Sequence, residues 1–100
     1  MNTRTMRLPR LVAGRDFADD MVHSFGQVLG EDVIVDGTEL LSGTPSFAAE
    51  LVRQLLVEGR ARSLLLVGAP NDFAGFCTAA ARELEVTDRF DLAEQFRAAS

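Results

Sequence analysis

The chain has 100 residues, 47% hydrophobic and 25% charged, a composition typical of one soluble globular domain and unlike a disordered or collagen-like chain. Its 15 acidic and 10 basic residues give a net charge of −5, which argues against nucleic acid as a partner, because that binding needs clustered positive charge. No apolar run has the length of a membrane helix or a signal peptide, so we expect a cytoplasmic protein that does not bind membranes.

The N-terminal third predicts an edge strand, a helix and a buried strand. Residues 1–5 are expected to form a flexible arm, and "TMRLPRLV" (residues 5–12) to add an edge strand, where Pro9 is tolerated. Apolar residues at helical spacing then predict a helix with Asp16 as its N-cap and Gly30 just beyond its end. The β-branched run "DVIVD" that follows is typical of a buried strand and ends at Asp36.

A middle helix is predicted from Pro45 to Glu58. Thr44 supplies an N-cap oxygen, and Pro45 suits the first helical position, where its missing N–H has no partner to lose. The periodicity directs Phe47 into the core, and it directs three polar side chains to solvent. These are Ser46, Glu50 and Arg53.

The C-terminal half repeats the alternation of strand and helix. "LLLVGAP" predicts a second buried strand, and a helix follows from about Pro70 with Phe73 and Cys77 on its apolar face. "DLAEQFRAAS" predicts a short docked helix at the end of the chain. We therefore expect one α/β domain, βαβαβα plus a short C-terminal helix, with a small, mainly parallel sheet of three or four strands.

The sequence offers little catalytic chemistry. His23 is the single histidine, and with Asp19 it could supply two metal ligands but no identifiable third. Cys77 is the single cysteine, which excludes an internal disulfide and fits a buried apolar position. The glycine-containing stretch after the second strand lacks the lysine and spacing of a P-loop. We expect no catalytic, cofactor-binding or metal-binding residues, and no enzyme.

Three hydroxyl residues, Ser42, Thr44 and Ser46, stand at the start of the middle helix. Capping alone selects such residues there. A phosphoacceptor would use the same positions, because free N–H groups and the helix dipole accommodate a phosphate at a helix start. Glu50, one turn on, would repel a phosphate on Ser46, so the residues by themselves leave both interpretations open.

The run "VIVDGTELLSGTPSFAAELVRQLLVEGRARSLLLVGAP", continued through "LEVTDRF", resembles the STAS domain of bacterial anti-sigma factor antagonists. "GRDFADDM" and the helix start "PSFAAEL" are similar to a STAS-like group of unknown function, and the likeness covers about residues 8–92. It implies a STAS-like fold and an interaction module that docks on a kinase-type (GHKL) anti-sigma factor or a related regulator, controlled by Ser/Thr phosphorylation.

One departure concerns the phosphoacceptor stretch of the family, Asp-Ser-Ser/Thr-Gly, which falls over residues 44–47. Thr44 replaces the aspartate, Pro45 replaces the first serine, and Ser46 is retained at the second position. The hypothesis is therefore docking with candidate phosphoacceptors Ser46, Thr44 and Ser42. The expected partner interface consists of Thr38, Glu39, Thr44, Pro45, Ser46, Glu50 and Arg53.

Two other interpretations stay open. A small ligand- or nucleotide-binding subunit, or an enzyme, would use the carboxyl ends of the strands at Asp36 and at residues 68–71, where open α/β sheets bind ligands. The domain could also be a docking adaptor in a larger bacterial signalling or defence assembly, and a second copy of the chain is a further candidate partner.

Overall fold

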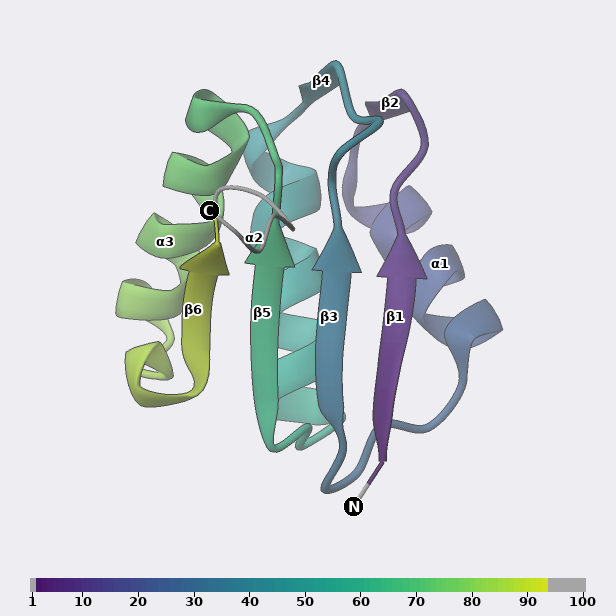
Figure 1. Ribbon diagram of the computed structural model, residues 1–100, viewed down its shortest axis with the longest axis vertical. Coiled ribbons are helices and arrows are strands. Elements are labelled where there is room, and N and C mark those ends of the chain that lie inside the picture. The colour runs from purple at the N-terminus through teal and green to yellow at the C-terminus, as the bar shows by residue number, and fades with distance from the viewer. Residues whose placement is uncertain (1, 94–100) are drawn as a thin grey trace, which may run out of the picture.

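The computed structural model describes residues 2–93 and has an α/β fold built on one parallel four-stranded sheet (Figure 1). The strands lie in the order β1 (Thr3–Arg7), β3 (Asp32–Asp36), β5 (Ser63–Val67) and β6 (Phe90–Ala93). Every neighbouring pair is parallel, with Thr5 beside Ile34 and Ile34 beside Leu65. The predicted α/β class and parallel sheet are confirmed, and the sheet has four strands.

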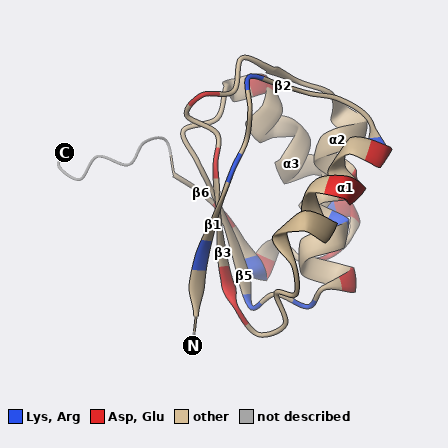
Figure 2. Cartoon of the chain, turned by 90° about the vertical axis from the view of Figure 1, so that its right-hand side faces the viewer, with Lys and Arg blue, Asp and Glu red and all other residues tan. Residues whose placement is uncertain are grey.

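All the helices lie on one face of this sheet, as the side view shows (Figure 2). They are α1 (Arg15–Phe25), α2 (Pro45–Val52) with the π-helical segment η1 (Arg53–Glu58), α3 (Asn71–Glu83) and the 3-10 turn η2 (Thr87–Arg89). The strands follow one another across the sheet in chain order, and right-handed crossovers then return each helix to the same face. The described part of the chain therefore places no helix over the other face.

The core lies between the sheet and its helices. Alternate residues of β3 and β5 point to the helix side, and they meet a fully buried stripe on α2 and α3. Phe47 is at its centre, with its ring 6.1 Å from that of Phe73 and 5.7 Å from that of Phe17. The prediction that Phe47 belongs to the core is confirmed.

Two short strands form a separate ribbon above the carboxyl ends of β1 and β3 (Figure 1). β2 (Leu11–Val12) pairs in parallel with β4 (Ser42–Gly43). The pairing holds the connection after β1 against the segment that enters α2, with Thr44 N donating to the Val12 carbonyl at 3.2 Å. This ribbon thereby fixes where α2 begins.

The helix limits follow the predicted pattern except at the two ends of α1, whose N-cap is Gly14 and not Asp16, which lies in the first turn. α2 and η1 together run from Pro45 to Glu58, as predicted, and Gly59 N bonds the Gln54 carbonyl at 2.8 Å in the wider π-helical ring. α1 ends at Phe25 rather than close to Gly30, because Gly26 has a φ of 96°, which glycine adopts without strain.

Both ends of the described chain correct the sequence predictions. Thr3 to Thr5 belong to β1 and not to the flexible arm predicted for residues 1–5, because β1 pairs with β3 along its whole length. Residue 1 lies outside the described residues. The C-terminal helix is wrong for Asp91 to Ala93, which form part of β6 beside β5. The remainder of that prediction, residues 94–100, also lies outside the described residues.

Candidate functional site

Thr44 holds the start of α2 and the start of α1 together. Its backbone is extended, and its side-chain Oγ1 accepts hydrogen bonds from Phe47 N at 3.2 Å and from Gly14 N at 3.1 Å. The first bond is the predicted N-cap, with Pro45 next in the first helical turn. The second reaches the residue that precedes α1. The Thr44 hydroxyl is therefore already used to fix the two helix starts.

Ser46 lies half-buried between these two helix starts. Its Oγ is 3.3 Å from Thr44 Oγ1, and it borders an open hollow of about 540 Å³ with Arg15 and Phe17 of α1. The expected free exposure of Ser46 is thus only partial. The hollow is lined by the first turn of α1 and reached from the first turn of α2, so it faces the positive ends of two helix dipoles.

The loop before α2 supplies most of the exposed interface residues. Glu39, Ser42 and Pro45 are exposed, as a partner surface requires. Thr38 is exposed as well, although its backbone N–H and its hydroxyl both donate to Asp36 Oδ1, at 2.9 and 2.7 Å. The loop and the helix start thus contain four exposed residues of the predicted interface.

Two leucines at this end of the molecule were not identified from the sequence. Leu11 and Leu41 are 66% and 69% exposed, although leucine is usually buried. Leu11 pairs with Ser42 across the β2–β4 ribbon, and Leu41 N donates to the Arg10 carbonyl at 2.8 Å, so the backbone of both is held in place. We call the surface formed by Leu11, Leu41, Ser42, Pro45 and Ser46 the docking corner.

The predicted solvent exposure of Glu50 is wrong. The residue is only 8% exposed, and its carboxylate accepts from Arg53 Nη2 at 2.6 Å and from Gln54 Nε2 at 2.8 Å. The Arg53 hydrogen bond, aided by that of Gln54, holds the pKa of Glu50 below its usual value against the opposing effect of burial. Gln54 Nε2 also donates to Asp19 of α1 at 2.9 Å.

This face of the middle helix is therefore covered by α1 rather than open to a partner. Arg53 is half-buried and is bound on both sides, since its Nη1 also donates to Glu58 at 2.9 Å. The correction has a consequence for Ser46. Because the charge of Glu50 is paired with Arg53, it opposes a phosphate one turn away less than the sequence suggests.

The interpretation as a ligand-binding subunit or enzyme places its site at the carboxyl ends of β3 and β5, where the structure has closely packed turns. Asp36 is 7% exposed, and its two bonds from Thr38, with Arg7 nearby, lower its pKa against the effect of burial. A Cβ on Gly68, whose φ is 69°, would lie 2.5 Å from the Thr38 side chain. A Cβ on Gly37 would lie 2.9 Å from that of Ala69. Asp36 thus stabilises a turn at the predicted ligand site.

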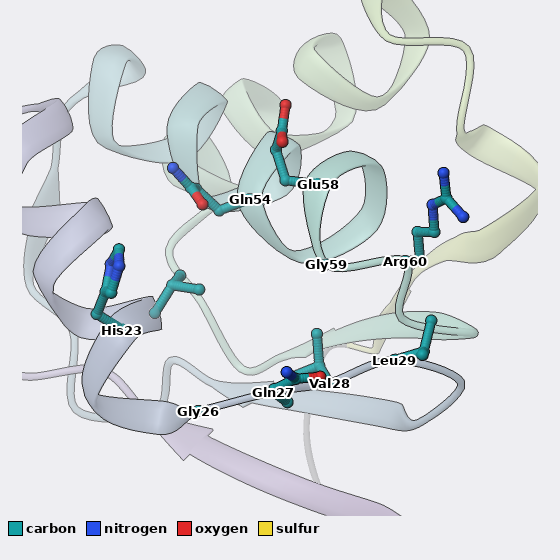
Figure 3. Close-up of a pocket in the computed structure, with 10 residues that line it drawn as sticks. His23, Gly26, Gln27, Val28, Leu29, Gln54, Glu58, Gly59 and Arg60 are labelled. Carbon is teal, nitrogen blue, oxygen red and sulfur yellow. The ribbon is translucent and has the colours of Figure 1, made fainter.

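A hollow of about 530 Å³ opens at the opposite end, between the end of α1 and the end of η1 (Figure 3). Val28 lies at its floor, and the side chains of His23, Glu58 and Arg60 point away from the segment that carries Val28 (Figure 3). Glu58 is paired with Arg53. No group of polar side chains therefore converges on this hollow as it would in a ligand site.

The single cysteine and the single histidine lie outside the docking corner. Burial raises the pKa of Cys77 to about 12, which leaves its thiol protonated and unreactive. His23 is exposed, with Nδ1 3.1 Å from the Asp19 carbonyl. Within residues 2–93, no three His, Cys, Asp or Glu side chains gather into a metal site. In the same range, no helix combines the length and hydrophobicity needed to cross a membrane.

Comparison with known proteins returns no match. No protein-family model, no curated protein and no solved structure matches the chain. The assignment of a function therefore depends on the residues and their arrangement.

Proposed function

We propose that this chain is a non-enzymatic, STAS-like protein-interaction domain that docks through the docking corner. The observation that supports the proposal most directly is the exposure of Leu11 and Leu41, 66% and 69%, on a hydrogen-bonded ribbon. Exposed apolar side chains whose backbone is held by hydrogen bonds are suited to act as interface anchors, because little backbone entropy is lost when they are covered. The STAS-like resemblance supplies the class of partner, a GHKL-type ATPase or a related regulator.

Of the three hydroxyl residues, Ser46 is the best candidate for a phosphoswitch. The Thr44 hydroxyl accepts two backbone hydrogen bonds, which a phosphate there would disturb. Ser42 is exposed in a two-residue strand and lies before the helix start. A phosphate on Ser46 would enter the hollow that Arg15 and Asp16 border, at the positive ends of α1 and α2, and would add a charge of about −1.5 to −2 to the docking corner.

A photo-crosslinking amino acid at position 41, introduced in cells of the native host, tests the docking corner. Leu29 is the matched control, since it is the same residue type, is 65% exposed, and borders the hollow between the ends of α1 and η1 rather than the docking corner. We expect a cross-link to a GHKL-type ATPase from position 41 and none from position 29. Equal labelling from both positions, or labelling of position 29 alone, would contradict the proposal.

The phosphoswitch is tested separately with the partner recovered in that way. Ser46→Asp is expected to weaken binding about tenfold or more, because it places negative charge inside the interface, and Ser46→Ala is expected to keep it. Mass spectrometry of the native protein should then find phosphate on Ser46 and none on Thr44. Equal binding by both variants would refute the switch without affecting the docking proposal.

A further inference from the structure

The outer edge of β1 is unpaired in the part of the chain that the structure describes. The ladder to β3 begins with Asp32 N donating to the Asn2 carbonyl and ends with Leu8 N donating to the Asp36 carbonyl, both at 2.9 Å. In a parallel ladder, alternate residues bond the same neighbour, so Thr3, Thr5 and Arg7 direct their N–H and C=O groups away from β3. Among the described residues, no strand pairs with this side of β1.

A groove runs between that edge and α1. It has a volume of about 400 Å³, and its apolar wall consists of Met6 from β1 with Phe17, Met21 and Phe25 from α1. The three helix residues are spaced by four and so share one side of α1. Phe17 is 38% exposed, and Met21 and Phe25 are only partly buried, so this apolar row is incompletely covered. A free strand edge thus lies beside a row of apolar side chains.

The charged side chains near the outer edge of β1 determine which kind of strand can pair with it. Of the two arginines in β1, Arg4 lies on the helix side and is paired with Glu31 at 2.8 Å. Arg7 lies on the open face, where its side chain is 70% exposed with its Nε 3.7 Å from Asp36, and β1 has no acidic residue. On the helix side, the groove is bordered by Asp20, which disfavours acidic side chains there. A strand added to β1 is therefore favoured if it carries an acidic residue beside Arg7 on the open face of the sheet and apolar residues in the groove.

A second copy of this chain does not meet these conditions. A second β1 strand would present Thr3, Thr5 and Arg7 on the open face, and so would place a second Arg7 there and no acidic residue. In addition, α1 extends beyond β1 at this edge of the molecule, so the α1 helices of two copies would approach each other over the shared edge (Figure 1). A single extended segment carries no such helix.

We propose that the β1–α1 groove binds an extended peptide segment of a partner protein as a fifth strand, with acidic and apolar residues alternating along it. Main-chain hydrogen bonds to Thr3, Thr5 and Arg7 provide affinity, and the alternation of side chains provides specificity. This site is distinct from the docking corner, and the inference does not depend on the function proposed above.

The probe is a fluorescein-labelled nine-residue peptide in which glutamate alternates with leucine or valine, and the control peptide has lysine in place of glutamate. We expect fluorescence anisotropy to show binding of the glutamate peptide and about tenfold or weaker binding of the lysine peptide. In amide exchange measured by NMR, the N–H groups of Thr3, Thr5 and Arg7 should gain protection, while those of β6 stay unchanged.

Thr5→Pro is the decisive variant, because it removes a donor that faces outward and leaves the β1–β3 hydrogen bonds in place. It is expected to weaken binding of the glutamate peptide about tenfold or more, whereas Thr5→Ala, which keeps the N–H, should bind like the natural chain. Far-UV circular dichroism checks the fold. Met21→Glu, which places a charge in the groove, is a second variant expected to lose binding.

Several results would overturn the inference. The first is equal binding of the two peptides. The second is no binding of the glutamate peptide at concentrations up to about 1 mM. The third is unchanged peptide binding by Thr5→Pro and Met21→Glu. Analytical ultracentrifugation that finds a dimer of the natural chain, dissociated by Thr5→Pro, would show instead that a second copy occupies the edge.

Discussion

Replacing Thr44 by alanine should loosen two helix starts at once. The substitution removes the oxygen that accepts from Phe47 N at 3.2 Å and from Gly14 N at 3.1 Å. Loss of a side-chain N-cap costs about 1 kcal/mol. An N–H left without its partner costs up to about 1 kcal/mol more, reduced here because Gly14 is partly open to water. We expect the free energy of unfolding to fall by about 1.5–2 kcal/mol in total.

Thermal and urea unfolding measure this loss. In a chain of 100 residues, it corresponds to a Tm lower by about 10 °C. Thr44→Ser keeps the oxygen and should lose less than about 0.5 kcal/mol. Hydrogen exchange should speed up at both Gly14 and Phe47 in Thr44→Ala and at neither in Thr44→Ser. Equal stability of the two variants, or faster exchange at Phe47 alone, would refute the double role of the hydroxyl.

Three further predictions concern other parts of the fold. Because its folded-state pKa lies below the usual 4.5, Glu50 contributes stability above that pH and loses it as the pH falls through the folded value. Glu50→Gln should therefore be less stable by about 1 kcal/mol at pH 7 and approach the natural chain in acid, and parallel pH profiles would contradict this. Gly68→Ala should cost about 2–3 kcal/mol in urea unfolding, from its φ of 69° and the 2.5 Å approach to Thr38. Gly75→Ala, in α3 with open space around it, should instead stabilise by about 0.5–1 kcal/mol. Cys77 should react with a thiol reagent only on unfolding, and rapid labelling of the native protein would disprove its burial.

The sequence predicted the elements that are short continuous apolar runs or whose limits carry a turn signal. β3 and β5 are short β-branched or leucine-rich runs inside the sheet, and α2 begins at Thr44–Pro45, where two independent helix signals coincide. These features are local. A few neighbouring residues specify them, so no knowledge of the tertiary fold was needed.

The edges of the sheet were harder to predict because half of each edge strand faces water. β1 has a polar sequence, since Thr3, Thr5 and Arg7 lie on the uncovered face, and β6 contains an exposed aspartate. The error at Glu50 is also one of tertiary structure. A carboxylate is usually exposed, and only the approach of α1, which brings Asp19 to Gln54, shows that this one is enclosed by hydrogen bonds. The exposed leucines of the docking corner carry no local signal either.

The sequential winding of the strands places the first and last of them at opposite edges of the sheet, with the start of β1 and the end of β6 also at opposite ends of their strands (Figure 1). Three strand spacings of about 4.8 Å and a strand length of about 16 Å separate those points by about 22 Å. In a circular permutant, the chain between Ala93 and Thr3 would therefore need at least about seven extended residues. A shorter joint would pull one edge strand away from its neighbour, and strand separation at the joined edge would be the first defect of such a variant.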